Sequence, residues 1–116
     1  MEYIYKATVM RIIDGDTVDL DIDLGFHVSI KQRVRLAGID TPEKTSSIQE
    51  TRERAFKATL RLRELIPENS TVSIQTFKAD KYGRMLAVIS TKTSVKTVNQ
   101  ILLDENLATE YNGGKK

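Results

Sequence analysis

The sequence is poor in the residues that mark several large classes of protein. Its 116 residues contain no cysteine, no tryptophan, two prolines and a single histidine, His27. The lack of cysteine excludes disulfides and thiolate metal sites, and one histidine is too few for a multi-histidine zinc site. Any bound metal would therefore be held by oxygen atoms, which points to calcium, magnesium or manganese.

Long hydrophobic runs are missing too, and charge of either sign is not in large excess. Because the chain has no apolar stretch long enough for a signal peptide or a membrane span, we expect a cytoplasmic protein with no membrane partner. A length of 116 residues with 40% hydrophobic and 29% charged residues predicts one ordinary globular domain. The net charge of +2 permits nucleic-acid binding without predicting it, since a polyanion binder needs a local patch.

Alternation of apolar and polar residues predicts three strands in the first third of the chain. The first covers residues 3–13 and ends at the turn signal Asp-Gly-Asp-Thr of residues 14–17. In the second, aliphatic side chains at 18, 20 and 22 face the core, while Asp19, Asp21 and Asp23 face water. The third runs over residues 28–36, so these strands form a meander.

Two helices and two further strands complete the predicted order. A capping box at residues 47–50 begins a helix that ends before Pro67, and another at 97–100 begins a second, with Asn106 as its left-handed cap. Strands are predicted over 72–77 and 85–90. The order β-β-β-α-β-β-α predicts a mainly β fold with helices (α+β), a five-stranded OB-fold barrel over residues 1–112, with a flexible tail at 113–116.

The principal candidate site lies where the third strand ends. After Leu36 the alternation reverses, which predicts a bulge near residues 37–38 that brings Asp40 to the same side as Arg35. Pro42 then stops the strand, so Glu43 leaves in a stiff turn beside them. One guanidinium and two carboxylates suit a metal ion and a phosphate, although a solvated strand end with an Arg–Asp surface pair would have the same sequence.

Asp16 differs from the other aspartates of the first hairpin. It lies in phase with the aliphatic face, so its carboxylate reaches the rim of the core, where a cation would offset the cost of a buried charge. The alternative is a carboxylate that caps turn amides, for which Asp14 is the better candidate.

The loop at residues 78–84 is rich in cations. Arg84 could act as a bidentate phosphate clamp, with Lys81 and Tyr82 as neighbouring contacts. A plain turn with edge-protecting lysines would look similar.

Together these motifs resemble the staphylococcal nuclease (thermonuclease-like) family. The resemblance rests on Asp-Gly-Asp-Thr at 14–17, Arg35 with Asp-Thr-Pro-Glu at 40–43, and Asp-Lys-Tyr-Gly-Arg at 80–84, in the family's order and at similar spacings. Val98-Asn99 followed by Leu107-Ala108 is similar to the family's late helix. The resemblance spans residues 7–111.

The resemblance implies a calcium-dependent nuclease that cuts DNA or RNA, with single strands preferred, and leaves 5′-hydroxyl and 3′-phosphate ends. The residues it implies fall into three groups: calcium ligands Asp16, Asp40 and the carbonyl of Thr41; catalytic residues Arg35, Glu43 and Arg84; and nucleotide contacts Lys81, Tyr82 and Tyr111. Glu43 would either deprotonate or orient the attacking water. We expect a monomer or a weak oligomer.

Two other functions stay open at this stage. An OB-fold can bind single-stranded nucleic acid without cutting it, but three acids facing a polyanion would not help such a module, and 6% aromatic residues make a poor stacking surface. A plain structural domain would require all three charged motifs to be coincidental.

Overall fold

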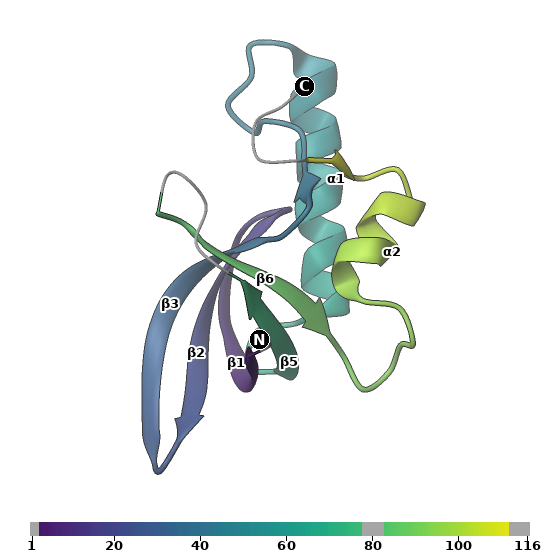
Figure 1. The fold of residues 1–116 in the computed structure, drawn as a ribbon. Coiled ribbons are helices and arrows are strands. Elements are labelled where there is room, and N and C mark those ends of the chain that lie inside the picture. Colours follow the sequence, from purple (N-terminus) through teal and green to yellow (C-terminus); the bar gives the residue numbers. More distant parts are fainter. Residues whose placement is uncertain (1–2, 78–82, 112–116) are drawn as a thin grey trace.

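The computed structural model describes residues 3–77 and 83–111, and a closed five-stranded barrel dominates them (Figure 1). The barrel strands are β1 (Tyr3–Asp14), β2 (Thr17–Gly25), β3 (Val28–Leu36), β5 (Thr71–Phe77) and β6 (Met85–Ser90), in the spatial order β1-β2-β3-β6-β5. All neighbours are antiparallel except β3 and β6, which pair in parallel over Val34–Leu36 and thereby close the barrel. This mainly β barrel with two helices confirms the predicted OB-like fold.

The core fills the barrel interior and the space beneath the helices. In β2 the aliphatic side chains are buried and the alternate aspartates lie toward the outside, as the two-residue period predicts. In β1 a register shift between Val9 and Arg11 reverses the phase, so that Ile12 also points inward. The largest fully buried side chains are Leu20, Leu36, Ile39, Leu62, Ile66, Ile74, Ile89, Leu102, Val9, Val18 and Val98.

Helix α1 (Gln49–Leu65) buries Ala55, Ala58 and Leu62 and ends at Ile66, before Pro67. The predicted capping box at residues 47–50 is wrong. The N-cap residue is Ile48, and no side chain caps the helix. The Ser46 hydroxyl instead accepts a hydrogen bond from the Ile48 amide, 3.1 Å, and this local turn keeps the preceding residues out of the helix.

Helix α2 (Val98–Asp104) begins at the predicted residue, because the Thr97 side chain accepts a hydrogen bond from the Gln100 amide. The predicted capping box is only half formed, since the Gln100 side chain donates to Asp104 at 2.8 Å instead of turning back to Thr97. Asn106 has a φ of 60° and is the expected left-handed residue after the helix. Arg61 of α1 donates two 2.8 Å hydrogen bonds to Glu105, and this pairing lowers the pKa of the Glu105 carboxyl and links the two helices. Among the described residues, neither helix has the length and apolar character needed to cross a bilayer.

The predicted bulge near residues 37–38 is a complete break in the strand. β3 ends at Leu36, Gly38 turns the chain with a φ of 77°, and the next two residues form β4 (Ile39–Asp40). β4 pairs with β7 (Thr109–Glu110) in a separate two-stranded sheet that the sequence did not predict. The predicted consequence still holds, because Asp40 lies beside Arg35. The tail at 113–116 and most of the loop at 78–84 lie outside the described residues.

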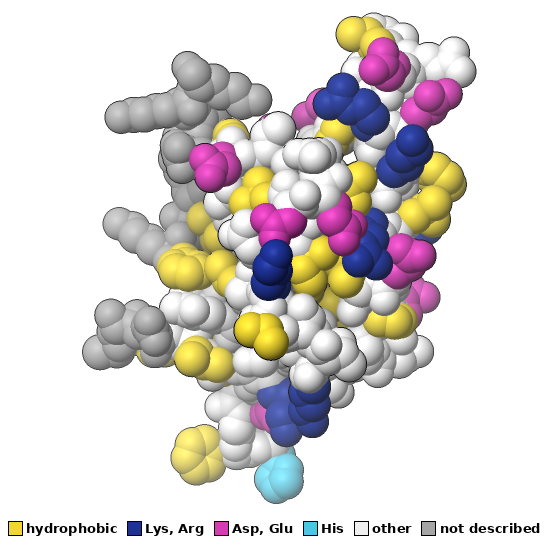
Figure 2. Space-filling view, turned by 90° about the vertical axis from the view of Figure 1, so that its right-hand side faces the viewer, with side chains coloured by type: hydrophobic (Ala, Val, Ile, Leu, Met, Phe, Trp, Pro, Cys, Tyr) yellow, Lys and Arg dark blue, Asp and Glu magenta, His cyan; other side chains and the backbone are white. Residues whose placement is uncertain are grey.

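Acidic and basic side chains are interspersed on the face shown in Figure 2. Several surface side chains form ion pairs, such as Lys96 with Asp104 at 2.6 Å. On the outside of the barrel, Arg33 of β3 bonds Asp19 of β2 and lowers the pKa of that carboxyl. These pairs link neighbouring elements on the surface.

Asn99 is a buried polar residue that ties three elements together. Its Oδ1 accepts a hydrogen bond from the Ile89 amide of β6 at 3.1 Å, and its Nδ2 donates to the carbonyls of Ala37, 2.8 Å, and Ala87, 3.2 Å. Asn99 thereby fixes α2 to β6 and to the turn at which β3 breaks.

Replacing Asn99 by leucine should lower the free energy of unfolding by at least about 2 kcal/mol, because buried backbone groups would lose their partner. Urea unfolding measures this loss. Gln100→Leu, at the adjacent exposed position, is the matched control and should change stability by less than about 0.5 kcal/mol. Equal stability of the two variants would contradict the assigned role of Asn99.

Candidate active site

The candidate site is a cavity of about 410 Å³ beside the end of β3. Its lining contains every predicted site residue in the described part of the chain: Asp16, Arg35, Asp40, Thr41, Glu43, Arg84 and Tyr111. Lys81 and Tyr82 lie outside the described residues. The tertiary structure therefore brings together side chains that span almost the whole sequence.

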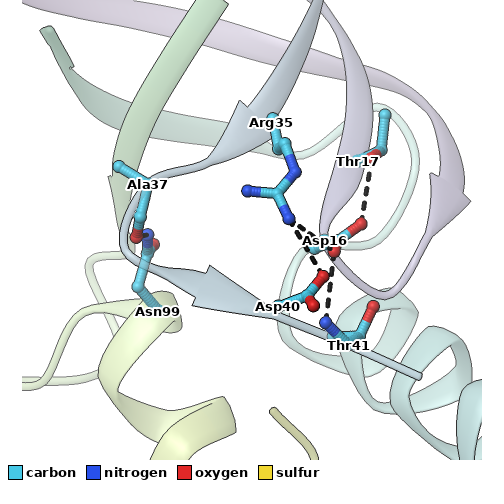
Figure 3. Close-up of polar contacts among 7 residues, drawn as sticks. All are labelled: Asp16, Thr17, Arg35, Ala37, Asp40, Thr41 and Asn99. Carbon is cyan, nitrogen blue, oxygen red and sulfur yellow. Dashed lines mark hydrogen bonds and ion pairs between the residues drawn. The ribbon is translucent and has the colours of Figure 1, made fainter. Parts of the chain in front are cut away.

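Arg35 lies at the centre of the polar network in Figure 3. Its Nη2 donates to Asp40 Oδ1 at 3.0 Å and lies 3.5 Å from Asp16 Oδ2. The Arg35 side chain is only 8% exposed, so solvent screens these contacts weakly. The guanidinium also lies over the ring of Tyr111, 4.8 Å from its centroid. Two carboxylates and one aromatic ring thus fix the orientation of the guanidinium.

Asp16 sits at the turn between β1 and β2, where both of its carboxylate oxygens are used. Oδ1 accepts a hydrogen bond from the Thr17 hydroxyl, 3.0 Å, and Oδ2 accepts one from the Thr41 amide, 3.2 Å. The residue is 8% exposed, as expected for a position in phase with the core. Asp14, which the sequence made the better candidate for capping turn amides, pairs with the Lys44 ammonium at 3.1 Å.

Glu43 and Arg84 are the exposed members of the site. Glu43 follows Pro42 on the segment that leaves β4. Next to it, Lys44 donates to the carbonyl of Ile13 at 3.3 Å as well as pairing with Asp14, which ties this segment to the end of β1. Lys44 is a positioning residue that the sequence did not identify; its proximity to Glu43 was the only signal.

The charges at the inner end of the cavity suit a divalent cation. Two carboxylates, Asp16 and Asp40, face one guanidinium, so an anionic phosphate would meet excess negative charge there unless a cation also bound. Carboxylate and carbonyl oxygens are the ligands that calcium prefers. Within residues 3–77 and 83–111, no three His, Asp or Glu side chains could hold an ion by themselves, so backbone or water oxygens would complete the set.

The sequence matches the family described as "Staphylococcal nuclease homologue" over residues 33–116. The chain belongs to the staphylococcal nuclease family. This finding agrees with the closed barrel and confirms the resemblance of the motifs.

Several curated proteins are similar to this family member. It is 32% identical to "Protein ParB" of Escherichia coli over 91% of its own length and 57% of that protein. It is 31% identical to an "Uncharacterized endonuclease" of Escherichia coli O157:H7, with 89% and 59% covered, and 34% identical to "Thermonuclease" of Staphylococcus intermedius, with 70% and 46% covered. The chain therefore spans about half the length of these relatives.

Gly15 lets the β1–β2 turn lie close to α1. A Cβ atom at position 15 would lie 2.7 Å from Ala58 Cβ, closer than two carbon atoms can approach, and a tight 3.2 Å from Thr41 Cγ2. The φ angle of Gly15 lies outside the left-handed region, so the constraint is one of space alone. The absence of a side chain lets the β1–β2 turn approach the helix and hold Asp16 next to Thr41.

Gly15→Ala should lower the free energy of unfolding by about 1–3 kcal/mol through this clash. In an Ala58→Gly background the same change should cost less, with a coupling energy of about 1 kcal/mol, since the nearest clashing atom is gone. Chemical unfolding of the double-mutant cycle measures the coupling.

Ala55→Gly, one turn earlier on the same helix, provides the control for loss of a buried helical methyl. The losses of stability caused by Gly15→Ala and Ala55→Gly should be additive, with no coupling energy. Coupling of equal size to positions 55 and 58 would show that the proposed contact is not specific.

Proposed function

We propose that this chain is a calcium-dependent nuclease domain that hydrolyses the phosphodiester bonds of DNA or RNA and leaves 5′-hydroxyl and 3′-phosphate ends. The observation that carries the proposal is the convergence of Arg35, Asp16, Asp40, Glu43 and Arg84 on one solvent-accessible cavity. The names of two relatives, an endonuclease and a thermonuclease, support it.

The proposed calcium ligands are Asp16, Asp40 and the backbone carbonyl of Thr41. Two carboxylates and a carbonyl leave coordination positions for water and for a phosphate oxygen. When bound, calcium would neutralise charge on the phosphate and polarise its phosphorus–oxygen bonds.

Arg35 and Arg84 would hold the phosphate. A guanidinium can donate two parallel hydrogen bonds to phosphate oxygens, and both arginines can strengthen these bonds as negative charge builds in the transition state. Arg35 is already oriented by Asp16, Asp40 and Tyr111, so little reorganisation is needed when the phosphate binds. Arg84 is exposed and immediately precedes β6, the strand that pairs with the end of β3.

Glu43 would act on the attacking water. Its carboxylate at the cavity can accept a hydrogen bond from that water and either orient it or take its proton. A new oxygen–phosphorus bond forms as the bond from phosphorus to the 5′ oxygen breaks. This direction of attack gives the 3′-phosphate and 5′-hydroxyl ends. Tyr111, Lys81 and Tyr82 are the proposed contacts to the rest of the nucleotide.

The first test is cleavage of single-stranded DNA by the full chain with calcium and with chelator. We expect calcium-dependent cutting that is lost in Asp40→Asn, a variant that keeps an oxygen to accept the Arg35 hydrogen bond but removes a charged ligand. Circular dichroism should show a folded variant. Cutting that is insensitive to chelator would refute the proposed metal dependence, and salt-sensitive binding without cutting would instead indicate a nucleic-acid-binding module.

The second test concerns Arg84. Replacing it with alanine should lower kcat by about a hundred- to a thousandfold, the cost of losing one preorganised transition-state donor, with little change in stability because the residue is exposed. Arg63→Ala, an exposed arginine of α1 outside the cavity, is the matched control and should retain full activity. Near-normal turnover of Arg84→Ala would remove Arg84 from the catalytic set.

A further inference from the structure

A second groove of about 220 Å³ adjoins the candidate site. Asp40, Thr41 and Pro42 line both cavities, so β4 and the residues after it form the wall between them. The other walls of this groove, called here the α1 groove, are Thr51, Arg54 and Lys57 of α1 and the segment 106–109 between α2 and β7. In Figure 1 that segment passes from α2 across to β4 alongside α1.

Two cations on α1 face this groove. Arg54 and Lys57 are three residues apart, which places them on the same side of the helix, and both are exposed. Among the described residues neither forms an ion pair. Glu53, the acid one turn before Lys57, instead accepts a hydrogen bond from the Gln49 side chain at 3.2 Å. Neither cation is therefore held in an ion pair with an acid of the helix, and both can turn toward a ligand in the groove.

Two other cations of the helical part of the molecule have structural partners. Arg61, one turn after Lys57, is bonded twice to Glu105, and Lys96 pairs with Asp104. The groove thus has a cationic wall on α1 and an apolar part formed by Leu107 and Ala108. Its one carboxylate among the described residues, that of Asp40, is bonded to Arg35 in the neighbouring site.

We infer that the α1 groove is a subsite for the strand that the candidate site would cut, where Arg54 and Lys57 bind one further phosphate of its backbone. This inference rests on the proposed function. Guanidinium and ammonium groups at a groove wall are the usual partners of backbone phosphates, and the adjacent Leu107 and Ala108 offer a surface on which the sugar carbons of the same strand can pack. Because Asp40, Thr41 and Pro42 line both cavities, the groove lies directly beside the site, and the proposed strand would pass from Arg35 over Thr41 and Pro42 into it.

The test measures binding of a labelled single-stranded oligothymidylate to the full chain, in chelator, over a range of salt concentrations. The double variant Arg54→Gln/Lys57→Gln should bind about tenfold more weakly than wild type. Its slope of log K against log salt should be shallower by about 0.7, the value for one lost phosphate contact on a single strand.

The matched control is Arg63→Gln/Lys92→Gln, which removes the same net charge from exposed positions outside both cavities. It should bind within about twofold of wild type with an unchanged slope. Equal losses of affinity in the two double variants would overturn the subsite, because they would report net charge alone. An absence of salt-dependent binding by wild type would overturn it as well. If wild type binds without ever cutting in calcium, the proposed nuclease function fails, while a specific loss in Arg54→Gln/Lys57→Gln still establishes the groove.

Discussion

The structure of the candidate site depends on one buried guanidinium. Arg35 is charged and almost fully enclosed, a state that is tolerated only because Asp16 and Asp40 lie against it and Tyr111 covers its face. Removing a partner from such a group costs far more than a surface ion pair contributes, since the remaining charge stays buried. The β1–β2 turn, the end of β3, and β4 are therefore held in one arrangement by electrostatics as much as by packing.

The barrel provides the rigid support for this arrangement, and its irregularities supply the geometry. The parallel pairing of β3 with β6 closes the barrel, and the break at Gly38 then releases the chain so that Asp40 turns back toward Arg35. Asn99 fixes that break from α2, and the missing side chain at Gly15 lets Asp16 approach from the other side. Membership in the staphylococcal nuclease family agrees with this plan, in which a stable barrel presents functional groups at the points where its strands end.

The surface charges fall into two groups, those held in ion pairs and those around the candidate site. Pairs such as Arg61 with Glu105 and Arg33 with Asp19 neutralise each other and link neighbouring elements. Around the site the balance is different: carboxylates outnumber the cation at its inner end, and Arg54 and Lys57 line the adjoining groove without ion pairs among the residues described. A polyanion and a divalent cation together would complement both regions, so under the proposed function a chain with a net charge of only +2 still offers a local surface for nucleic acid.

Strand periodicity and turn residues are local properties, so the sequence by itself determined the order of strands and helices along the chain and the second hairpin strand with its outward aspartates. The expected site residues came from the charged motifs and from the family resemblance, which alone pointed to Tyr111. The sequence also placed Asp16 in phase with the core. Contacts between distant segments were decided only by the tertiary structure: the cation–π contact of Tyr111, the anchoring of the turn by Asn99, the pairing of β4 with β7, and the fit of Gly15 against Ala58. Local patterns fix which face of a strand a side chain occupies, but the three-dimensional packing of the chain decides what that face meets.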